Sequence, residues 1–239
     1  MDLVGEALRA VRTAILEVPF QVASAVRGAR VFHPQGLMVH GEVRLNSPWW
    51  PPGVSCVRPL SARLSGGVGT PNGLPDVLGM ALKLSTGTAG GGEWDILLAN
   101  SGTAAATRVL PLPAASWSRA HYSSLMPYAK AGGPVRWILA TPVGTHPAGT
   151  SLDALARSLA TAPQHFDLAL ASASGEVAPA GHLVLSQILR LDDNMHPSFD
   201  PVLNCPAELV LRPRWLTTAR RNAYRGSRKG RATGRTRFG

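Results

Sequence analysis

Residues 78–100 are LGMALKLSTGTAGGGEWDILLAN, and this stretch decides the fold. Apolar side chains occupy every second position from Met80 to Leu84, which is the period of a strand with one buried face. A second apolar run follows a turn that is rich in glycine and threonine. Two such runs joined by a glycine-rich turn predict an antiparallel hairpin, with strands at Leu78–Thr86 and Trp94–Asn100.

Similar runs lie on both sides of this hairpin, separated by clusters of Gly, Pro and Asn. They cover Val31–His33, Leu37–Leu45, Cys56–Ser65, Val135–Thr141, Phe166–Ser172 and His182–Leu191. Ala62 and Leu64 are further candidates for the core, and Trp94 is expected there as well. About eight short strands with tight turns predict an antiparallel β-barrel. A two-sheet sandwich gives the same pattern, so the strand pattern alone leaves both architectures open.

Helical patterns flank the strands and favour the α+β class. Residues 3–18 carry apolar side chains at steps of three and four, which predicts an amphipathic helix. A second helix is predicted at Leu152–Ala160, with Ser151 as its N-cap. A third is predicted at Trp215–Lys229, beyond an irregular connection at Pro197–Pro213. Residues 113–133 are expected to form a loop with a helical turn.

No linker or repeat divides the chain, so we expect one domain over residues 1–239. Its expected parts are an N-terminal helical segment at 1–27, the barrel at 28–191, a C-terminal helix at 212–232 and a frayed basic tail at 233–239.

The net charge of +10 is confined to the end of the chain. Ten Arg or Lys and no acid lie between Arg212 and Gly239, so the 14 basic groups left in residues 1–211 balance the 14 acidic ones. The excess positive charge is therefore a local feature of the C-terminal segment and not a property of the barrel.

Cysteine usage and the N-terminus predict a cytoplasmic protein. Cys56 and Cys205 form no CxxC pair, so neither a zinc site nor a disulfide framework is expected. Arg9, Arg12 and Glu17 interrupt the apolar core that a signal peptide would need. No segment approaches ~20 uninterrupted apolar residues, so no membrane span is predicted.

Common catalytic and metal motifs are missing from the sequence. The glycine-rich run Gly66–Gly69 lacks the Lys-Ser/Thr ending of a phosphate loop. No Gly-x-Ser-x-Gly elbow supports a hydrolase. Asp192, Asp193 and His196 are interpreted as a solvated loop. The seven histidines show no HxH or HxxxH spacing, which disfavours a mononuclear histidine–metal site.

Five segments resemble motifs of haem catalases and occur in the same order. They are Arg30–Gly36, Ala62–Ser65, Pro75–Lys83, Glu93–Asn100 and Arg220–Tyr224. The first is similar to the catalase distal motif, with an Arg three residues before the catalytic His and a Gly three residues after it. The next three are similar to the Arg-Phe-Ser, Asp-Pro-Arg-Gly-Phe-Ala-Val-Lys and Asn-Trp-Asp-Leu-Val-Gly-Asn-Asn strands. The last has the Arg-x-x-x-Tyr spacing of the proximal helix.

The resemblance covers roughly residues 28–102 and 212–232 and is greatest to short bacterial catalase-like haem proteins. It implies a catalase-like barrel that binds haem b, with His33 as the distal acid/base and Tyr224 as the axial iron ligand. The other haem contacts that it implies are Arg30, Arg63, Ser65, Arg220, Arg228 and Arg231. The substrates would be hydrogen peroxide or an organic hydroperoxide and an unknown reductant. A hydroperoxide isomerase belongs to the same class.

The chemistry of these side chains suits that function. Histidine titrates near neutral pH, so it can take a proton from a peroxide and return it to the leaving oxygen. A tyrosinate donates electron density to a haem iron. Arg220 and Tyr224 are four residues apart, so on a helix they meet on one face, and the guanidinium favours the anionic phenolate. Arg63 lies inside an apolar strand and needs a counter-charge, which a propionate or Asp76 could supply.

Asn100 is the catalytic amide that the resemblance implies, although it is displaced by one residue. Catalases carry the distal amide at the position that Ala99 holds here. A shift of one residue in a strand moves a side chain to the opposite face. Either a bulge restores the position of Asn100, or the protein has no distal amide and poorer positioning of peroxide.

The alternative function is non-catalytic binding on the same scaffold, with the basic C-terminus contacting nucleic acid or anionic lipid. Nucleic acid is the less favoured partner, because Phe238 is the tail's one aromatic residue. The chain gives no basis for NADPH binding or an interlocked tetramer, so we expect a monomer or a small homo-oligomer.

Overall fold

The computed structural model describes residues 36–52, 54, 57–66, 75–86, 92–190 and 197–213. Several expectations lie outside these ranges and stay predictions. They are the segment 1–27, the strand Val31–His33, nearly all of the helix at 212–232 and the tail 233–239. The proposed haem contacts outside the described residues are His33, Tyr224, Arg30, Arg220, Arg228 and Arg231.

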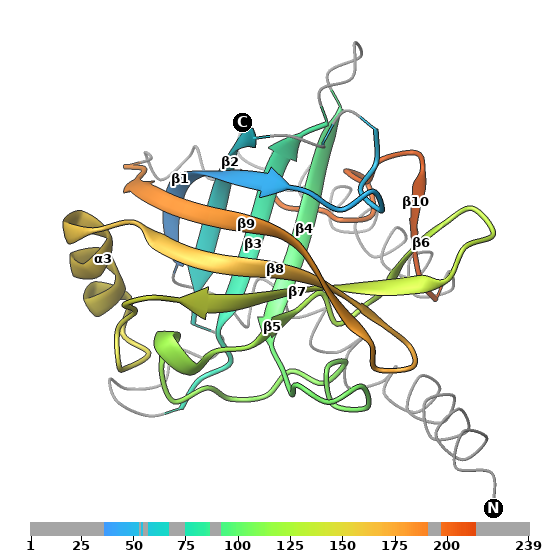
Figure 1. Ribbon diagram of the computed structural model, residues 1–239. Helices are drawn as coiled ribbons and strands as arrows, with labels where there is room; N and C mark the ends of the chain where they lie inside the picture. The colour runs from blue at the N-terminus through green and yellow to red at the C-terminus, as the bar shows by residue number, and fades with distance from the viewer. Residues whose placement is uncertain are drawn as a thin grey trace, which may run out of the picture.

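The described part of the chain is mostly β-structure (Figure 1). The strands are β1 Gly36–Leu45, β2 Val57–Ser65, β3 Gly79–Ser85, β4 Glu93–Asn100, β5 Tyr122–Ser123, β6 Tyr128–Lys130, β7 Val135–Val143, β8 Gln164–Ser172, β9 Val177–Ile188 and β10 Leu209–Leu211. One short 3-10 helix, η1 Trp117–Arg119, and one α-helix, α3 Leu152–Thr161, accompany these strands. The helices predicted at residues 3–18 and Trp215–Lys229, on which the α+β class also depends, lie outside the described residues.

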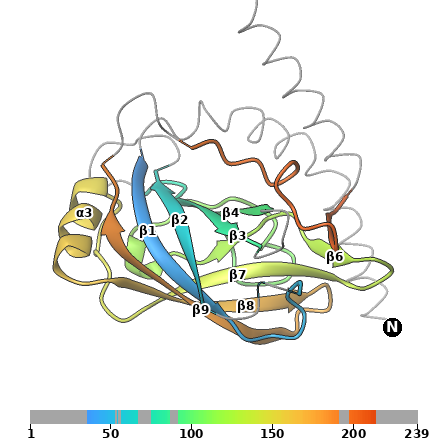
Figure 2. The ribbon, with the colours of Figure 1, turned by 90° about the horizontal axis from the view of Figure 1, so that it is seen from above.

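Eight strands close into an antiparallel barrel. They are hydrogen-bonded in the order β1–β2–β3–β4–β5–β7–β8–β9, and β9 pairs back with β1. The order of these eight strands around the barrel is the same as their order along the chain. Successive strands of the eight are therefore hydrogen-bonded neighbours. Seen from above, β2–β4 lie on one side and β7–β9 on the other (Figure 2). The predicted barrel is therefore confirmed, and the sandwich alternative is wrong.

Three short strands were not predicted, because two or three residues are too few to show a period. β5 and β6 pair with the same edge of β7 and are separated by residues 124–127, where Leu125 has a φ of 53°. Both lie in the segment expected to be a loop, and η1 is its expected helical turn. β10 pairs with β6 and lies in the connection Pro197–Pro213, which was expected to be irregular.

Alternate residues of the strands fill the barrel. Leu64, Met80 and Leu98 pair in register across β2, β3 and β4, and all three are buried. Trp94 is fully buried, with its ring edge-on to the rings of Trp50 and Tyr128. The core positions expected on these strands, including Trp94, are therefore confirmed.

The helix α3 begins where the sequence predicts. The Ser151 hydroxyl accepts a hydrogen bond from the Ala154 N–H at 3.4 Å, and Leu155 and Leu159 form its buried face. In the described ranges, no helix has the length and apolar character needed to cross a bilayer.

The barrel closes between β1 and β9 at a point where a side chain has no room. The register of this pair shifts between His40 and Gly41. A Cβ atom at Gly41 would collide with the carbonyl oxygen of Val184 and would lie 2.9 Å from a methyl group of Leu185. Gly41 therefore allows the two backbones to approach closely enough to pair.

We expect Gly41→Ala to destabilise the protein by about 2 kcal/mol or more, because the added methyl group must push β9 away from β1. Gly149→Ala is the matched control, since a Cβ atom there has nothing within 4 Å. We expect the control to change stability by less than about 0.5 kcal/mol. Urea unfolding followed by tryptophan fluorescence measures both variants. Equal stability of the two would contradict this account of the closure.

Candidate functional site

Two of the predicted haem contacts, Arg63 and Ser65, lie within the described residues. Both are on the outside of the barrel wall β1–β4. Directly paired residues of antiparallel strands point to the same face, so the register defines rows across this wall. The first row is Gly36, Ser65, Gly79 and Ala99, and the second is Met38, Arg63, Ala81 and Leu97. We call these eight residues the outer face. It carries five residues no larger than serine, with Arg63 as its one charged side chain.

Arg63 is folded against the backbone of Gly36. A Cβ atom at Gly36 would lie 2.6 Å from Cζ and 2.7 Å from Nε of Arg63. A larger residue at position 36 would therefore push the guanidinium away. His33 precedes Gly36 by three residues, a span of at most about 11 Å of extended chain. The fold thus brings Arg63 to Gly36, the last residue of the predicted distal motif Arg30–Gly36.

Burial shapes the electrostatics of this face. Loss of solvent lowers the pKa of the Arg63 guanidinium, which nevertheless stays charged at neutral pH. Ser65 is buried beside it on the same strand. The Asp76 carboxylate accepts a hydrogen bond from the Val77 N–H at 2.7 Å, and the Asp76 backbone pairs with Ala114. Asp76 thereby fixes the chain just before β3.

Asn100 lies on the face of β4 opposite to the outer face. The register between β3 and β4 runs without a shift, so no bulge moves Asn100 onto the outer face. Its side-chain NH2 donates to the carbonyl oxygen of Leu112 at 2.7 Å, and its side-chain oxygen accepts from the His121 N–H at 2.8 Å. Asn100 therefore braces the end of the barrel, and Ala99 occupies the corresponding place on the outer face.

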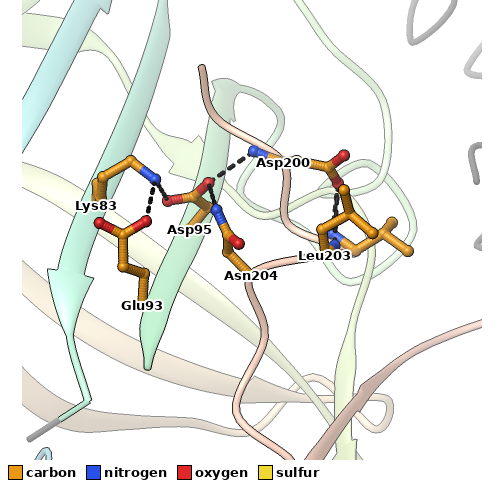
Figure 3. Close-up of polar contacts among 7 residues, drawn as sticks. Lys83, Glu93, Asp95, Asp200, Leu203 and Asn204 are labelled. Carbon is orange, nitrogen blue, oxygen red and sulfur yellow. Dashed lines mark hydrogen bonds and ion pairs between the residues drawn. The ribbon is translucent and has the colours of Figure 1, made fainter. Parts of the chain in front are cut away.

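A buried carboxylate borders the outer face in the next row of β4. Asp95 is fully buried, although it points away from the barrel core. It accepts hydrogen bonds from the Lys83 ammonium at 2.7 Å, the Asp200 N–H at 2.7 Å and the Asn204 side chain at 2.8 Å (Figure 3). We call this arrangement the Asp95 clamp. It holds residues 200–204 against the outside of β4.

Lys83 completes the Asp95 clamp from β3. Its ammonium also contacts Glu93 at 3.0 Å and lies 5.6 Å from the centre of the Phe199 ring. Desolvation lowers the Lys83 pKa, but the hydrogen bonds to Asp95 and Glu93 outweigh it, so the pKa is raised overall. The lysine therefore stays charged at neutral pH and neutralises the buried carboxylate. Residues 197–205 run along the outside of this wall (Figure 2).

Sequence reasoning assigned no role to Asp95. The available signal was an acid between Trp94 and Ile96, since a carboxylate in an apolar strand needs partners. Its partners on residues 200–204 lie more than a hundred residues away and have no sequence signature.

The outer face combines small side chains with one cation, and its residues are buried or partly buried. Five of its eight residues are glycine, alanine or serine, and Arg63 is its one charged residue. In the part of the chain that the structure describes, no three or more His, Cys, Asp or Glu residues converge as metal ligands. No family model matches the chain, and no curated protein or solved structure matches it.

We expect Asp95→Ala to lower stability by about 3 kcal/mol, because it leaves the donors of Lys83, Asp200 and Asn204 without their buried acceptor. It should also expose residues 197–213 to limited proteolysis. Glu93→Ala removes the exposed partner of the same lysine and should change stability by less than about 1 kcal/mol. Urea unfolding and protease digestion measure both. A similar loss in the two variants would show that the Asp95 clamp does not hold this segment.

Proposed function

We propose that the chain is a haem b-dependent oxidoreductase of catalase type, which acts on hydrogen peroxide or an organic hydroperoxide as a peroxidase. The observation that carries this proposal is the position of Arg63, folded over Gly36 on an outer face of small residues. The ordered resemblance to catalase motifs supports it, since Arg63, Ser65 and Gly36 belong to two separate motifs and meet on one face.

The residues of the outer face fit haem in two respects. Gly36, Gly79 and Ala99 lie in one row and carry no side chain larger than a methyl group that would hold a planar ring away from the strands. Leu97, in the next row, is partly exposed and offers an apolar contact to it. Arg63 suits a propionate, because a desolvated guanidinium gains most from a carboxylate partner.

The chain's own residues divide the work as follows. His33, three residues before Gly36, takes the proton of the peroxide and returns it to the leaving oxygen. Tyr224 would hold the haem iron as a phenolate, and Arg220 would favour its anionic form. Arg30, Arg228 and Arg231 offer further cations for propionates. Haem, when bound, supplies a redox-active iron for cleavage of the peroxide bond.

Ala99 favours a peroxidase over a fast catalase. With Asn100 turned to the other face, β4 presents no amide to a peroxide on the outer face. Positioning of the substrate then depends on His33 and on apolar contacts. Such a site suits an organic hydroperoxide better than rapid disproportionation of hydrogen peroxide.

We expect the full chain, expressed with sufficient haem, to show a Soret band and peroxidase turnover. Tyr224→Phe should greatly weaken the Soret band, because phenylalanine cannot ligate iron. His33→Ala should retain haem and lose at least about 100-fold in turnover, as expected when a general acid/base is removed. Absorption spectroscopy and a peroxidase assay measure these effects. A folded protein that takes up no haem would overturn the proposal, and salt-dependent binding of nucleic acid or anionic vesicles would then favour the binding alternative.

A second variant tests the outer face itself. Ala99→Leu should weaken haem binding by about ten-fold or more, which corresponds to ~1.4 kcal/mol, because the larger side chain lifts the ring from the strands. Ala178→Leu adds the same volume at an exposed position of β9 and should leave haem affinity unchanged. Titration of the haem-free chain with haem gives both affinities. Equal haem affinity in the two variants would place haem elsewhere.

A further inference from the structure

A pair of histidines lies on the outside of the hairpin formed by β8 and β9. His165 Nδ1 and His182 Nε2 are 3.2 Å apart, and His182 Nδ1 lies 3.0 Å from a carboxylate oxygen of Asp167. Asp167 pairs directly with His182, and His165 is its diagonal neighbour across the two strands. The pair and Asp167 therefore form one chain of contacts across the hairpin.

The distance between the two ring nitrogens is close to the distance between two nitrogen ligands of a tetrahedral metal ion. Zinc binds imidazole nitrogen at about 2.0–2.1 Å, so two nitrogens at tetrahedral positions lie ~3.3 Å apart. The observed 3.2 Å is close to this value. The two nitrogens are within hydrogen-bonding distance of each other, and a divalent ion can take the place of the hydrogen bond once both rings turn toward it.

Asp167 prepares His182 as a ligand. When the carboxylate accepts the Nδ1–H of His182, the lone pair of the neutral ring is left on Nε2, which faces His165. Metal-binding histidines commonly have such a carboxylate partner, which fixes the tautomer and raises the basicity of the ligand nitrogen. This feature distinguishes the pair from two histidines that merely touch.

We propose that His165 and His182 form a two-histidine site for a divalent transition-metal ion, positioned by Asp167. Imidazole ligands select zinc, nickel and copper over magnesium and calcium, and copper is expected to bind most tightly. The His182 side chain is 37% exposed and Asp167 is 69% exposed, so water can complete the coordination shell. A shell with two protein ligands makes the ion exchangeable.

Among the described neighbours, His146 does not join His165 and His182 as a third ligand. His146 Nε2 lies against the backbone oxygens of Val143 and His165, and burial is the largest influence on the His146 pKa, which is lowered. This third histidine is thus engaged with the backbone. β8 and β9 lie across the barrel from β2–β4, so the pair is separate from the outer face (Figure 2).

Isothermal titration of the full, metal-free chain with zinc or copper chloride tests the site. We expect the parent chain to bind one equivalent of metal, and to bind copper more tightly than zinc. His182→Gln should abolish this binding step or weaken it at least ten-fold. Asp167→Ala should weaken it by about ten-fold. His40→Gln removes an exposed histidine of β1 and should leave the affinity unchanged.

Melting temperatures of the metal-free variants control for folding, and zinc should raise that of the parent chain and of His40→Gln but not that of His182→Gln. The proposal is overturned if His182→Gln binds zinc and copper as tightly as the parent chain does. It is also overturned if His40→Gln loses as much metal affinity as His182→Gln. Neither result depends on haem, so this test and the test of the proposed function can fail separately.

Discussion

The unbroken antiparallel register of β1–β4 is the constraint on which the rest of the structure depends. It turns Leu64, Met80 and Leu98 into the barrel and leaves the residues beside them on the outside. A slip of one residue in any of these strands would exchange the two faces. Arg63 would then enter the apolar core, where an unpaired charge is strongly unfavourable. The apolar core therefore fixes the composition of the outer face.

Closure of the barrel leaves the outside of its wall as a surface on which other described segments pack. The Asp95 clamp shows how this packing is achieved. A fully buried carboxylate meets the ammonium of Lys83 and two donors from residues 200–204. Because its charge is compensated and its oxygens accept hydrogen bonds, its burial is tolerated, and it attaches a distant segment to β4. The same segment leads toward residues 212–232, which carry the proposed tyrosine ligand.

Both proposals use polar side chains on the outside of a barrel with an apolar interior. On β1–β4, the proposal places an organic ligand with an acidic edge beside the one guanidinium of a face of small residues. On β8 and β9, two imidazoles and a carboxylate that contact one another in a row favour a metal ion. The difference follows from composition, since the first wall presents Gly, Ala and Ser where the second presents His and Asp. The proposed second site is of a kind that the lack of HxH and HxxxH spacing in the sequence disfavours.

The sequence by itself determined the features that depend on neighbours along the chain. Alternation placed Met80 and Trp94 in the core, and Ser151 marked the start of α3, because strand period and helix capping are local effects. The same alternation left Asn100 with two alternative positions, and only the register of β3 and β4 decided between them. The tertiary structure also brought Arg63 to Gly36, Asp95 to Asn204 and His165 to His182. Each of these contacts joins residues from different strands or segments, so no spacing in the sequence could reveal it.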